Sequence, residues 1–313
     1  ESREVHMKKN TTLVLASYLT LYIVWGSTYL AIRVAVATMP AFYLVGFRYS
    51  IAGLGFLILS AATGRLKRLP SRKEIFAASF LGFFLLILGN GLVSLGEKTV
   101  DSYIAAIIIS STPFCVAFFN RLFFGERLHV TRLAGIVVGM SGVGLVLWRG
   151  GDTGIQLSGG IALIIAGFLA WSFATSYARK MPVHPDSFVN TGIEMSLAGV
   201  FAFLGSVLLY GPPTFALSGV SVESWLAMAY LAVVGGAAFL AYNYLLANEP
   251  SIRIVSYAIV NPLIAVFLGM LILGEKPVPL LWIGVPVILF GLILMLYGDK
   301  IFTSKKQIGR ANV

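Results

Sequence analysis

The sequence has little charge, one cysteine and few histidines, and each shortage excludes a class of protein. Charged residues make up 12% of the 313 positions, whereas soluble domains carry about 25%. The single Cys115 excludes an internal disulfide and a cysteine-based metal site. The histidines, His6, His129 and His184, fall in expected termini or loops without metal-ligand spacing. No GxxxxGK[ST] motif is present, which argues against direct use of ATP.

No nucleophile–base set stands out either, so we expect neither an enzyme nor a bound metal or cofactor. What the sequence has in excess is apolar residues. They make up 58% of the chain, and the mean hydropathy is +0.88, against roughly 45–50% apolar residues in a soluble domain. This composition predicts an all-α membrane protein, with the lipid bilayer as its first partner.

Ten apolar segments are long enough to cross a bilayer, which takes about 20 helical residues. The first has no small-residue cleavage site behind it, so we interpret it as a spanning helix and not as a signal peptide. The ten segments are approximately 12–34, 41–62, 74–95, 101–123, 130–148, 157–179, 187–209, 222–246, 254–273 and 280–298.

The connections between these segments carry their positive charge mostly on one side. With the N-terminus inside, the inner connections hold 18 Lys and Arg residues and the outer side holds five. Because cytoplasmic loops are enriched in Lys and Arg, both termini are predicted to be cytoplasmic in a bacterial inner (plasma) membrane protein. The asymmetry accounts for most of the net charge of +10, so no nucleic-acid partner is needed.

Two segments repeat one design. The stretch 261–276, NPLIAVFLGMLILGEK, matches 112–127, TPFCVAFFNRLFFGER, at a constant separation of 149 residues. In the first helix of each half, Trp25 and Arg33 match Trp171 and Arg179 at a separation of 146. The chain is therefore expected to be two diverged copies of one unit.

Each copy holds five helices, an odd number, so the second copy must enter the membrane from the opposite face. We predict ten transmembrane helices in two inverted five-helix repeats, an arrangement that suits alternating access. The expected units are 1–150, with a cytoplasmic arm at 1–11, then 151–299, and a cytoplasmic basic tail at 300–313.

These features together resemble the drug/metabolite transporter superfamily, in its ten-helix form with two EamA-type repeats. The resemblance rests on VWGSTYLAIRVA, on GFRYSIAG in the second helix, on the paired TPF…FGER and NPL…LGEK segments, and on the glycine-spaced fifth and tenth helices. It covers nearly the whole chain. It implies a bacterial inner-membrane transporter, commonly an exporter of amino acids, related metabolites or drugs.

Aromatic and polar side chains at helical spacing are the candidates for substrate binding. Trp25 and Tyr29 share one face of the first helix, and Trp171 and Thr175 repeat it in the sixth. A packing face or an interfacial aromatic belt is the alternative interpretation. Further candidates, for which helix–helix hydrogen bonding is the alternative, are Asn90, Tyr103, Ser110, Tyr242, Tyr257 and Asn261.

Two prolines and two charges complete the set. Pro113 and Pro262 remove a backbone hydrogen bond inside their helices and are either hinges or purely structural. Arg48 and Glu194 occupy equivalent positions 146 residues apart, about two turns inside their helices. Arg48 either pairs or extends to the outer interface. Glu194 is a proton-carrying carboxylate, half of a structural pair with an arginine, or a side chain that extends to the inner surface.

The leading functional prediction is a carrier that exports a small amphiphilic metabolite, either by facilitated transport or coupled to protons. The alternative is an exchanger or importer of a larger, nucleotide-like or phosphorylated metabolite, which would favour several inward-facing Arg or Lys residues. A monomer is expected, with a homodimer through the GxxxG of the fifth helix as the alternative.

Overall fold

The computed structural model describes residues 11–126, 130–148 and 158–310, and these residues form helices without a β-strand. The all-α prediction is thereby confirmed for the described chain. Most of the arm expected at residues 1–11, the boundary expected between residues 150 and 151, and residues 311–313 of the expected tail lie outside the described residues. Residues 300–310 of that tail continue the last helix.

Eight helical runs in the described chain are long and apolar enough to cross a membrane. They are Thr11–Val36 (α1 Thr11–Thr20, η1 Leu21–Trp25, α2 Gly26–Val36), Ala41–Ala62 (α3), Arg72–Gly96 (α4 Arg72–Gly82, η2 Phe83–Asn90, α5 Gly91–Gly96), Ser102–Phe124 (α6 Ser102–Ile109, α7 Thr112–Phe124), Val130–Leu147 (α8), Gly159–Lys180 (α9 Gly159–Tyr177, η4 Ala178–Lys180), Ser187–Tyr210 (α10) and Val222–Asn248 (α12 Val222–Tyr230, η5 Leu231–Gly235, α13 Gly236–Asn248).

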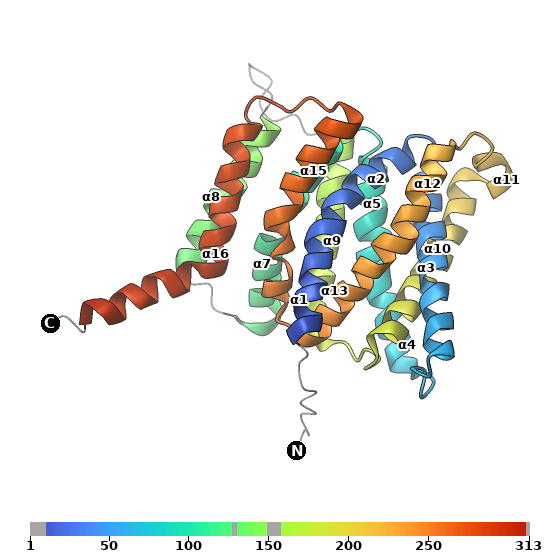
Figure 1. Cartoon of the computed structure of the whole chain (residues 1–313), viewed down its shortest axis with the longest axis horizontal. Helices are drawn as coiled ribbons and strands as arrows, with labels where there is room; N and C mark the ends of the chain where they lie inside the picture. Colours follow the sequence, from blue (N-terminus) through green and yellow to red (C-terminus); the bar gives the residue numbers. More distant parts are fainter. Residues whose placement is uncertain (1–10, 127–129, 149–157, 311–313) are drawn as a thin grey trace.

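Two shorter apolar helices follow, Val260–Leu273 within α15 (Tyr257–Leu273) and Leu281–Tyr297 within α16 (Leu281–Arg310). The connections contain the short helices α11 (Pro213–Ala216) and α14 (Ser251–Ile254). In Figure 1 the first run climbs from α1 at the lower edge to α2 at the upper edge. We call the side where α1 begins the N-terminal side, and the side where α2 ends the opposite side.

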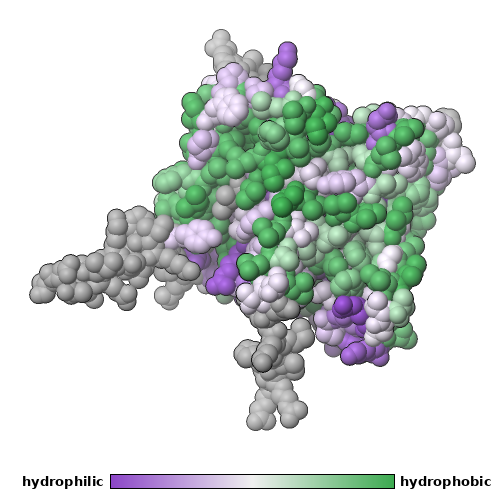
Figure 2. Space-filling view, viewed as in Figure 1, coloured by the Kyte–Doolittle hydropathy of each residue, from purple (hydrophilic) through white to green (hydrophobic). Residues whose placement is uncertain are grey.

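The outward faces of the helices are apolar, as a bilayer requires. Large hydrophobic side chains such as Leu208, Ile58 and Phe201 are exposed to 88%, 69% and 56%. Figure 2 shows hydrophobic residues spread over most of the visible face, with hydrophilic ones gathered near its upper and lower ends. A soluble protein rarely exposes so large a patch, whereas lipid tails cover it at no cost.

The second run packs along its counterpart, the seventh, with the two helices antiparallel. Gly53 of α3 faces the backbone of Ser196 in α10, and Gly199 of α10 faces the backbone of Ser50 in α3. Since Gly53 and Gly199, and likewise Ser50 and Ser196, are 146 residues apart, the two contacts are images of one another. Glycine is needed at both positions because a Cβ atom would collide with the facing backbone.

The glycine-rich helices α8 and α16 form a second antiparallel pair, at the left of Figure 1. Gly135 faces the backbone of Gly291 and Met295, and Gly142 faces Gly284. The glycine spacing of the sequence thus serves close packing within the chain.

The first and sixth runs also make equivalent contacts in the two halves. The first run packs against α12, α13 and α15, and α9 packs against η2, α5 and α7. The first and sixth runs are counterparts in the sequence, and so are the elements that each of them contacts. The two runs therefore have equivalent surroundings in the two halves.

The prolines lie in different local structures. Pro113 stands in the first turn of α7, directly after a break at Ser110 and Ser111, whereas Pro262 lies inside α15. Proline is well accommodated in a first turn because that N–H would have no helical partner. The fourth run is therefore interrupted ahead of its proline, whereas α15 continues through its own.

Candidate functional site

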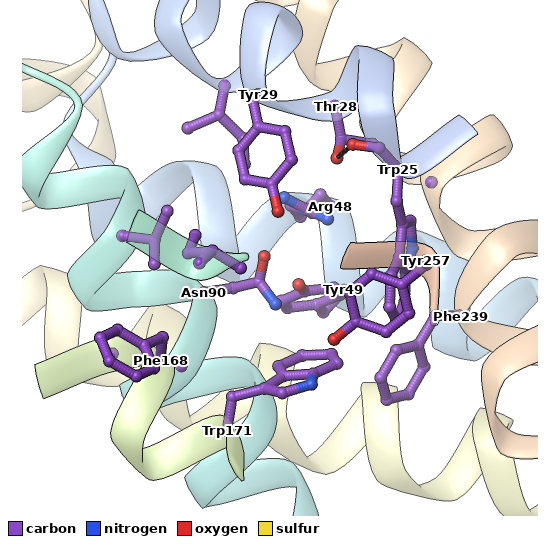
Figure 3. A pocket seen from close by; sticks show the side chains of 16 residues that line it. Trp25, Thr28, Tyr29, Arg48, Tyr49, Asn90, Phe168, Trp171, Phe239 and Tyr257 are labelled. Atoms are coloured by element: carbon purple, nitrogen blue, oxygen red, sulfur yellow. Dashed lines mark hydrogen bonds between the residues drawn. The ribbon is translucent and has the colours of Figure 1, made fainter. Parts of the chain in front are cut away.

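A cavity of about 640 Å³, its mouth included, lies between the first, second, third, fourth, sixth and eighth runs and the start of α15. Most of its lining comes from the parts of these runs nearer the opposite side, for example Ile32 late in the first run and Arg48 early in the second. Figure 3 shows the labelled side chains converging on this space. The lining residues are Trp25, Thr28, Tyr29, Ile32, Arg48, Tyr49, Gly89, Asn90, Val93, Ile109, Gly167, Phe168, Trp171, Gly235, Phe239 and Tyr257.

Two tryptophans in equivalent positions of the halves touch each other at this cavity. Trp25 and Trp171 meet edge to face, with ring centroids 5.4 Å apart. Tyr257 meets Trp25 at 4.8 Å and Phe239 meets Trp171 at 6.2 Å. Aromatic pairs prefer this edge-to-face geometry, and the flat faces that remain suit stacking on an amphiphilic or ring-bearing ligand. The cavity is therefore centred where the two halves meet.

Arg48 brings a positive charge into this aromatic space. Its side chain comes from α3, is 5% exposed, and lies over the Tyr49 ring at 4.5 Å from the centroid. Nε and Nη1 have no hydrogen-bond partner, and within the described residues no salt bridge to Arg48 is found. The guanidinium thus points into the cavity (Figure 3) and does not extend to the outer interface, so that part of the expectation was wrong.

Glu194, at the position equivalent to Arg48, lies in a different environment. It is fully buried on α10, and Oε2 accepts a hydrogen bond of 3.0 Å from Nδ2 of Asn243. Asn243 also donates to Thr191 at 3.1 Å, while Oε1 of Glu194 has no partner. The structure places Glu194 outside the aromatic cavity, between packed helices. A second cavity of about 380 Å³, lined by His184, Asn190 and Asn243 among others, reaches Asn243 from the N-terminal side.

The structure brings together only some of the residues predicted to bind substrate. Trp25, Tyr29, Asn90, Trp171 and Tyr257 line the cavity. Thr175 and Tyr242 lie below it, joined by a hydrogen bond of 2.6 Å between their hydroxyls. The ring of Tyr242 still contacts both tryptophans, at 5.1 and 5.2 Å, and so supports the floor of the cavity.

Three other predicted residues lie apart from the lining. Tyr103 donates to the carbonyl of Lys276 at 3.2 Å, on the opposite side. Ser110 donates to the carbonyl of Ile107 at 2.6 Å, within its own helix. Asn261 lies beside Tyr22 and Tyr257. With the amide turned so that its nitrogen faces them, Asn261 donates to the backbone carbonyls of both. These side chains satisfy local polar groups and leave the cavity to the larger aromatic residues.

Several lining residues were missed by sequence reasoning. Thr28 is one turn after Trp25, Phe168 one turn before Trp171, and Phe239 one turn before Tyr242, so helical spacing from the predicted residues would have found them. Tyr49 follows Arg48 directly. Nothing in the pattern indicates the π-helical segments η1, η2 and η5, which end at Trp25, Asn90 and Gly235 and so deliver three lining residues. Such segments are frequent at functional sites.

No cluster of three His, Cys, Asp or Glu side chains that could hold a metal ion occurs in the described part of the chain. The cavity has one cation, a carboxamide and several hydroxyl groups among aromatic rings. This chemistry suits reversible binding of a small molecule.

Comparison with known proteins agrees with this description. The model of the EamA-like transporter family matches residues 12–148 and again 158–297. The inner membrane transporter YedA of Escherichia coli K12 is 35% identical over 293 residues, which cover 92% of each chain. Transporter YdfC of Bacillus subtilis is 27% identical, with 89% of each chain covered. Protein PagO of Salmonella typhimurium is 25% identical, with 86% of this chain and 87% of PagO covered.

A solved crystal structure superposes with a TM-score of 0.66 over 91% of this chain and 96% of that one. Its sequence identity of 19% makes this a likeness of fold alone. The family model, in contrast, matches both halves in sequence. This chain belongs to the EamA-like transporter family.

Proposed function

We propose that this chain is a secondary transporter that exports small amphiphilic metabolites across a bacterial inner membrane by alternating access. It crosses the membrane ten times as two inverted five-helix repeats, residues 1–150 and 151–299. The N-terminal side faces the cytoplasm, with the N-terminal arm and the basic tail there, and the opposite side faces outward. The observation that carries the proposal is the aromatic cavity centred on the contact between the equivalent Trp25 and Trp171.

The helix packing supports the inverted repeats. The second and seventh runs, which are counterparts, are antiparallel, and so are α8 and α16. Counterparts that run in opposite directions place the two halves oppositely in the bilayer. Two halves of one design that differ in sequence can exchange conformations and open a shared site to alternate sides.

The cavity lining supports a small amphiphilic substrate, such as an amino acid or a related compound, or a drug. Trp25, Trp171 and Tyr257 offer flat apolar surfaces, and Tyr29, Asn90 and Arg48 offer hydrogen bonds. A pocket of mostly apolar walls with a few convergent polar groups is the usual form of a small-molecule site. Export is the direction that the family resemblance implies.

Glu194 is the candidate proton carrier in this scheme. A lone carboxylate between spanning helices is costly unless it pairs, takes up a proton or meets water. Its single donor is Asn243, and the second cavity reaches Asn243 from the N-terminal side. His184 Nε2 and Asn190 Oδ1, which also lack partners, line the same cavity. This polar path supports proton access to Glu194 from the cytoplasm.

Among the described residues, Arg48 is the one cationic side chain in the cavity lining. The alternative, an exchanger or importer of a larger phosphorylated metabolite, would favour several such cations. The lining therefore favours the smaller substrate. Pro113 and Pro262 remain hinge candidates, and a monomer is the proposed state because α8 and α16 use their glycines on each other.

A two-step experiment tests the proposal. The purified chain is screened by thermal shift against amino acids, nucleosides and cationic drugs, since a ligand that binds the folded state raises its melting temperature. The stabilising compound is then loaded into proteoliposomes, and accumulation of its radiolabelled form by counterflow is measured. A carrier accumulates label transiently above equilibrium. Equilibration without an overshoot contradicts alternating access, and uptake only into right-side-out vesicles contradicts export.

A further inference from the structure

Arg48 is a buried cation that forms no salt bridge with any described residue in this conformation. The guanidinium is 5% exposed, lines the aromatic cavity, and leaves Nε and Nη1 without acceptors. Nη2 lies 3.7 Å from the position that a Cβ atom on Gly235 would take, so this glycine leaves room beside the charge. An unpaired charge within a membrane protein marks a site where a ligand or another residue supplies the partner.

The other half of the molecule shows what kind of partner this position takes. Glu194, the counterpart of Arg48, receives its hydrogen bond from Asn243, which is 49 residues further along the chain. The residue 49 positions after Arg48 is Glu97. Glu97 is fully buried, and both of its carboxylate oxygens lack hydrogen-bond partners. The pair that is joined in one half is thus separated in the other, although its two members carry opposite charges.

We propose that Arg48 binds an acidic group of the substrate, a carboxylate on an apolar or aromatic body, and that Glu97 takes the place of that carboxylate when the cavity is empty and closed. The proposal rests on the proposed transport function and names its substrate class. A guanidinium can donate two parallel hydrogen bonds to a carboxylate, while Trp25 and Trp171 contact the apolar part. Arg48 is the one cation in the described lining, which suits one carboxylate better than a phosphate dianion.

The test compares ligands that all carry a phenyl ring and differ in their polar group, three of them on the same two-carbon chain. Binding of 3-phenylpropionate, 3-phenylpropionamide, 3-phenylpropylamine and phenyl phosphate to the purified chain is measured by tryptophan fluorescence, which Trp25 and Trp171 report from within the cavity. We expect 3-phenylpropionate to bind at least about tenfold more tightly than the amide, as a charge-assisted hydrogen bond allows. Equal binding of acid and amide, tighter binding of the amine, or absence of binding by the acid overturns the proposal. Tighter binding of phenyl phosphate by about tenfold overturns the carboxylate class.

Variants assign the effect to Arg48. In Arg48→Gln the preference for acid over amide should disappear, and in Arg48→Lys it should be reduced but kept, because lysine keeps the charge and loses the bidentate geometry. Arg65→Gln is the matched control, since Arg65 follows the same helix as Arg48, lies outside the lining and pairs with Asp186 at the surface. An acid preference that survives in a folded Arg48→Gln overturns the assignment. The wild-type comparison of acid with amide stands even if that variant does not fold.

Glu97→Gln tests the competing carboxylate. Removing its charge should tighten the binding of 3-phenylpropionate several-fold, because the empty state no longer supplies its own partner for Arg48. Weaker acid binding in this variant overturns the pairing of Glu97 with Arg48. Counterflow distinguishes the two proposals. Transport without a preference for acids would contradict only this inference, and acid binding without counterflow would contradict only the transport function.

Discussion

Arg48 and Glu194 occupy equivalent positions in the two halves of the chain, but their surroundings in the structure differ. Arg48 faces a cavity between the spans and has no acidic partner in the described chain, whereas Glu194 is packed between helices and bound by Asn243. The helix pair that carries them, α3 and α10, is symmetric in its glycine contacts. The asymmetry therefore comes from the surrounding spans and not from the pair itself.

This difference is what an alternating carrier needs at any one moment. Arg48 faces a space that both halves line, while the equivalent position of the other half is packed. In the proposed carrier the two arrangements would exchange, which would move the space to the other side. On the proposed alternating access, Glu194 would face a cavity on the N-terminal side when Arg48 is packed. The following substitutions test where the two halves are equivalent and where they differ, from the largest expected effect to the smallest.

Glu194→Gln should have the largest functional effect. The amide can still pair with Asn243 but cannot carry a proton, so we expect transport driven by a proton gradient to be abolished while the protein stays folded. Counterflow with and without a pH gradient is the measurement, and Glu126→Gln, a change in a half-exposed ion pair with Arg179, is the control. An unchanged response to the gradient in Glu194→Gln would remove the proton role.

Gly53→Ala should have the largest effect on stability. The added methyl group collides with the backbone of Ser196, and overpacking of this kind costs about 1–3 kcal/mol in unfolding free energy. Gly199→Ala should lose a similar amount because it meets Ser50 in the mirror-image contact. Gly55→Ala in the same helix is the matched control, since nothing lies within 4 Å of the added atom.

Thermal melting in detergent checks these three variants. A loss in Gly53→Ala with no loss in Gly199→Ala would show that the α3–α10 contact is not symmetric. Because alanine has a higher helix propensity than glycine, Gly55→Ala should not lose stability, and a loss as large as in Gly53→Ala would show that the collision with Ser196 is not the cause.

Trp25→Leu and Trp171→Leu test the centre of the cavity. Each substitution removes one aromatic surface of the cavity, and we expect each to weaken ligand binding by about tenfold. Trp282→Leu, at a side chain that is 65% exposed, should leave binding unchanged. The dissociation constant of the ligand found by thermal shift is the readout, and a loss in only one of the two cavity variants would argue against a shared central site.

The two glutamates after the fourth and ninth spans should show the smallest effects. Glu275 accepts hydrogen bonds from the backbone N–H and the hydroxyl of Ser102, at 2.8 and 2.9 Å, so it caps the start of α6. Glu126 instead pairs with Arg179 on the surface. We expect Glu275→Ala to cost about 1 kcal/mol of unfolding free energy and Glu126→Ala less than about 0.5 kcal/mol. Equal losses on thermal melting would refute the difference between them.

The sequence predicted the helical runs well because hydropathy and bilayer thickness leave few choices. The repeated Gly-Glu coincides with helix ends: Gly125 and Gly274 end α7 and α15 with φ of 66° and 64°, a conformation that favours glycine. The partners of the following glutamates were not predictable. Gly269 leaves room for the Glu275 carboxylate, whereas its counterpart Asn120 fills that space and bonds Ser251 at 3.3 Å.

The candidate site was predicted only in part for similar reasons. Spacing placed Trp25, Tyr29 and Trp171 on the faces that meet, because a helical face is a property of the sequence. The same argument placed Thr175 there, but its hydroxyl bonds Tyr242 in the packed half. Which of the two equivalent positions is packed depends on the conformation of the protein, and the pattern of residues in the sequence does not indicate it.

Accessibility of Tyr29 and its counterpart Thr175 tests alternating access most directly. Each is replaced by cysteine in a Cys115→Ser background and labelled with a membrane-impermeant maleimide in intact cells and in inverted vesicles. Alternating access predicts labelling of position 29 only from the outer side and of position 175 only from the cytoplasmic side, with a ligand that protects one raising the reactivity of the other. Labelling of both positions from the same side would contradict it.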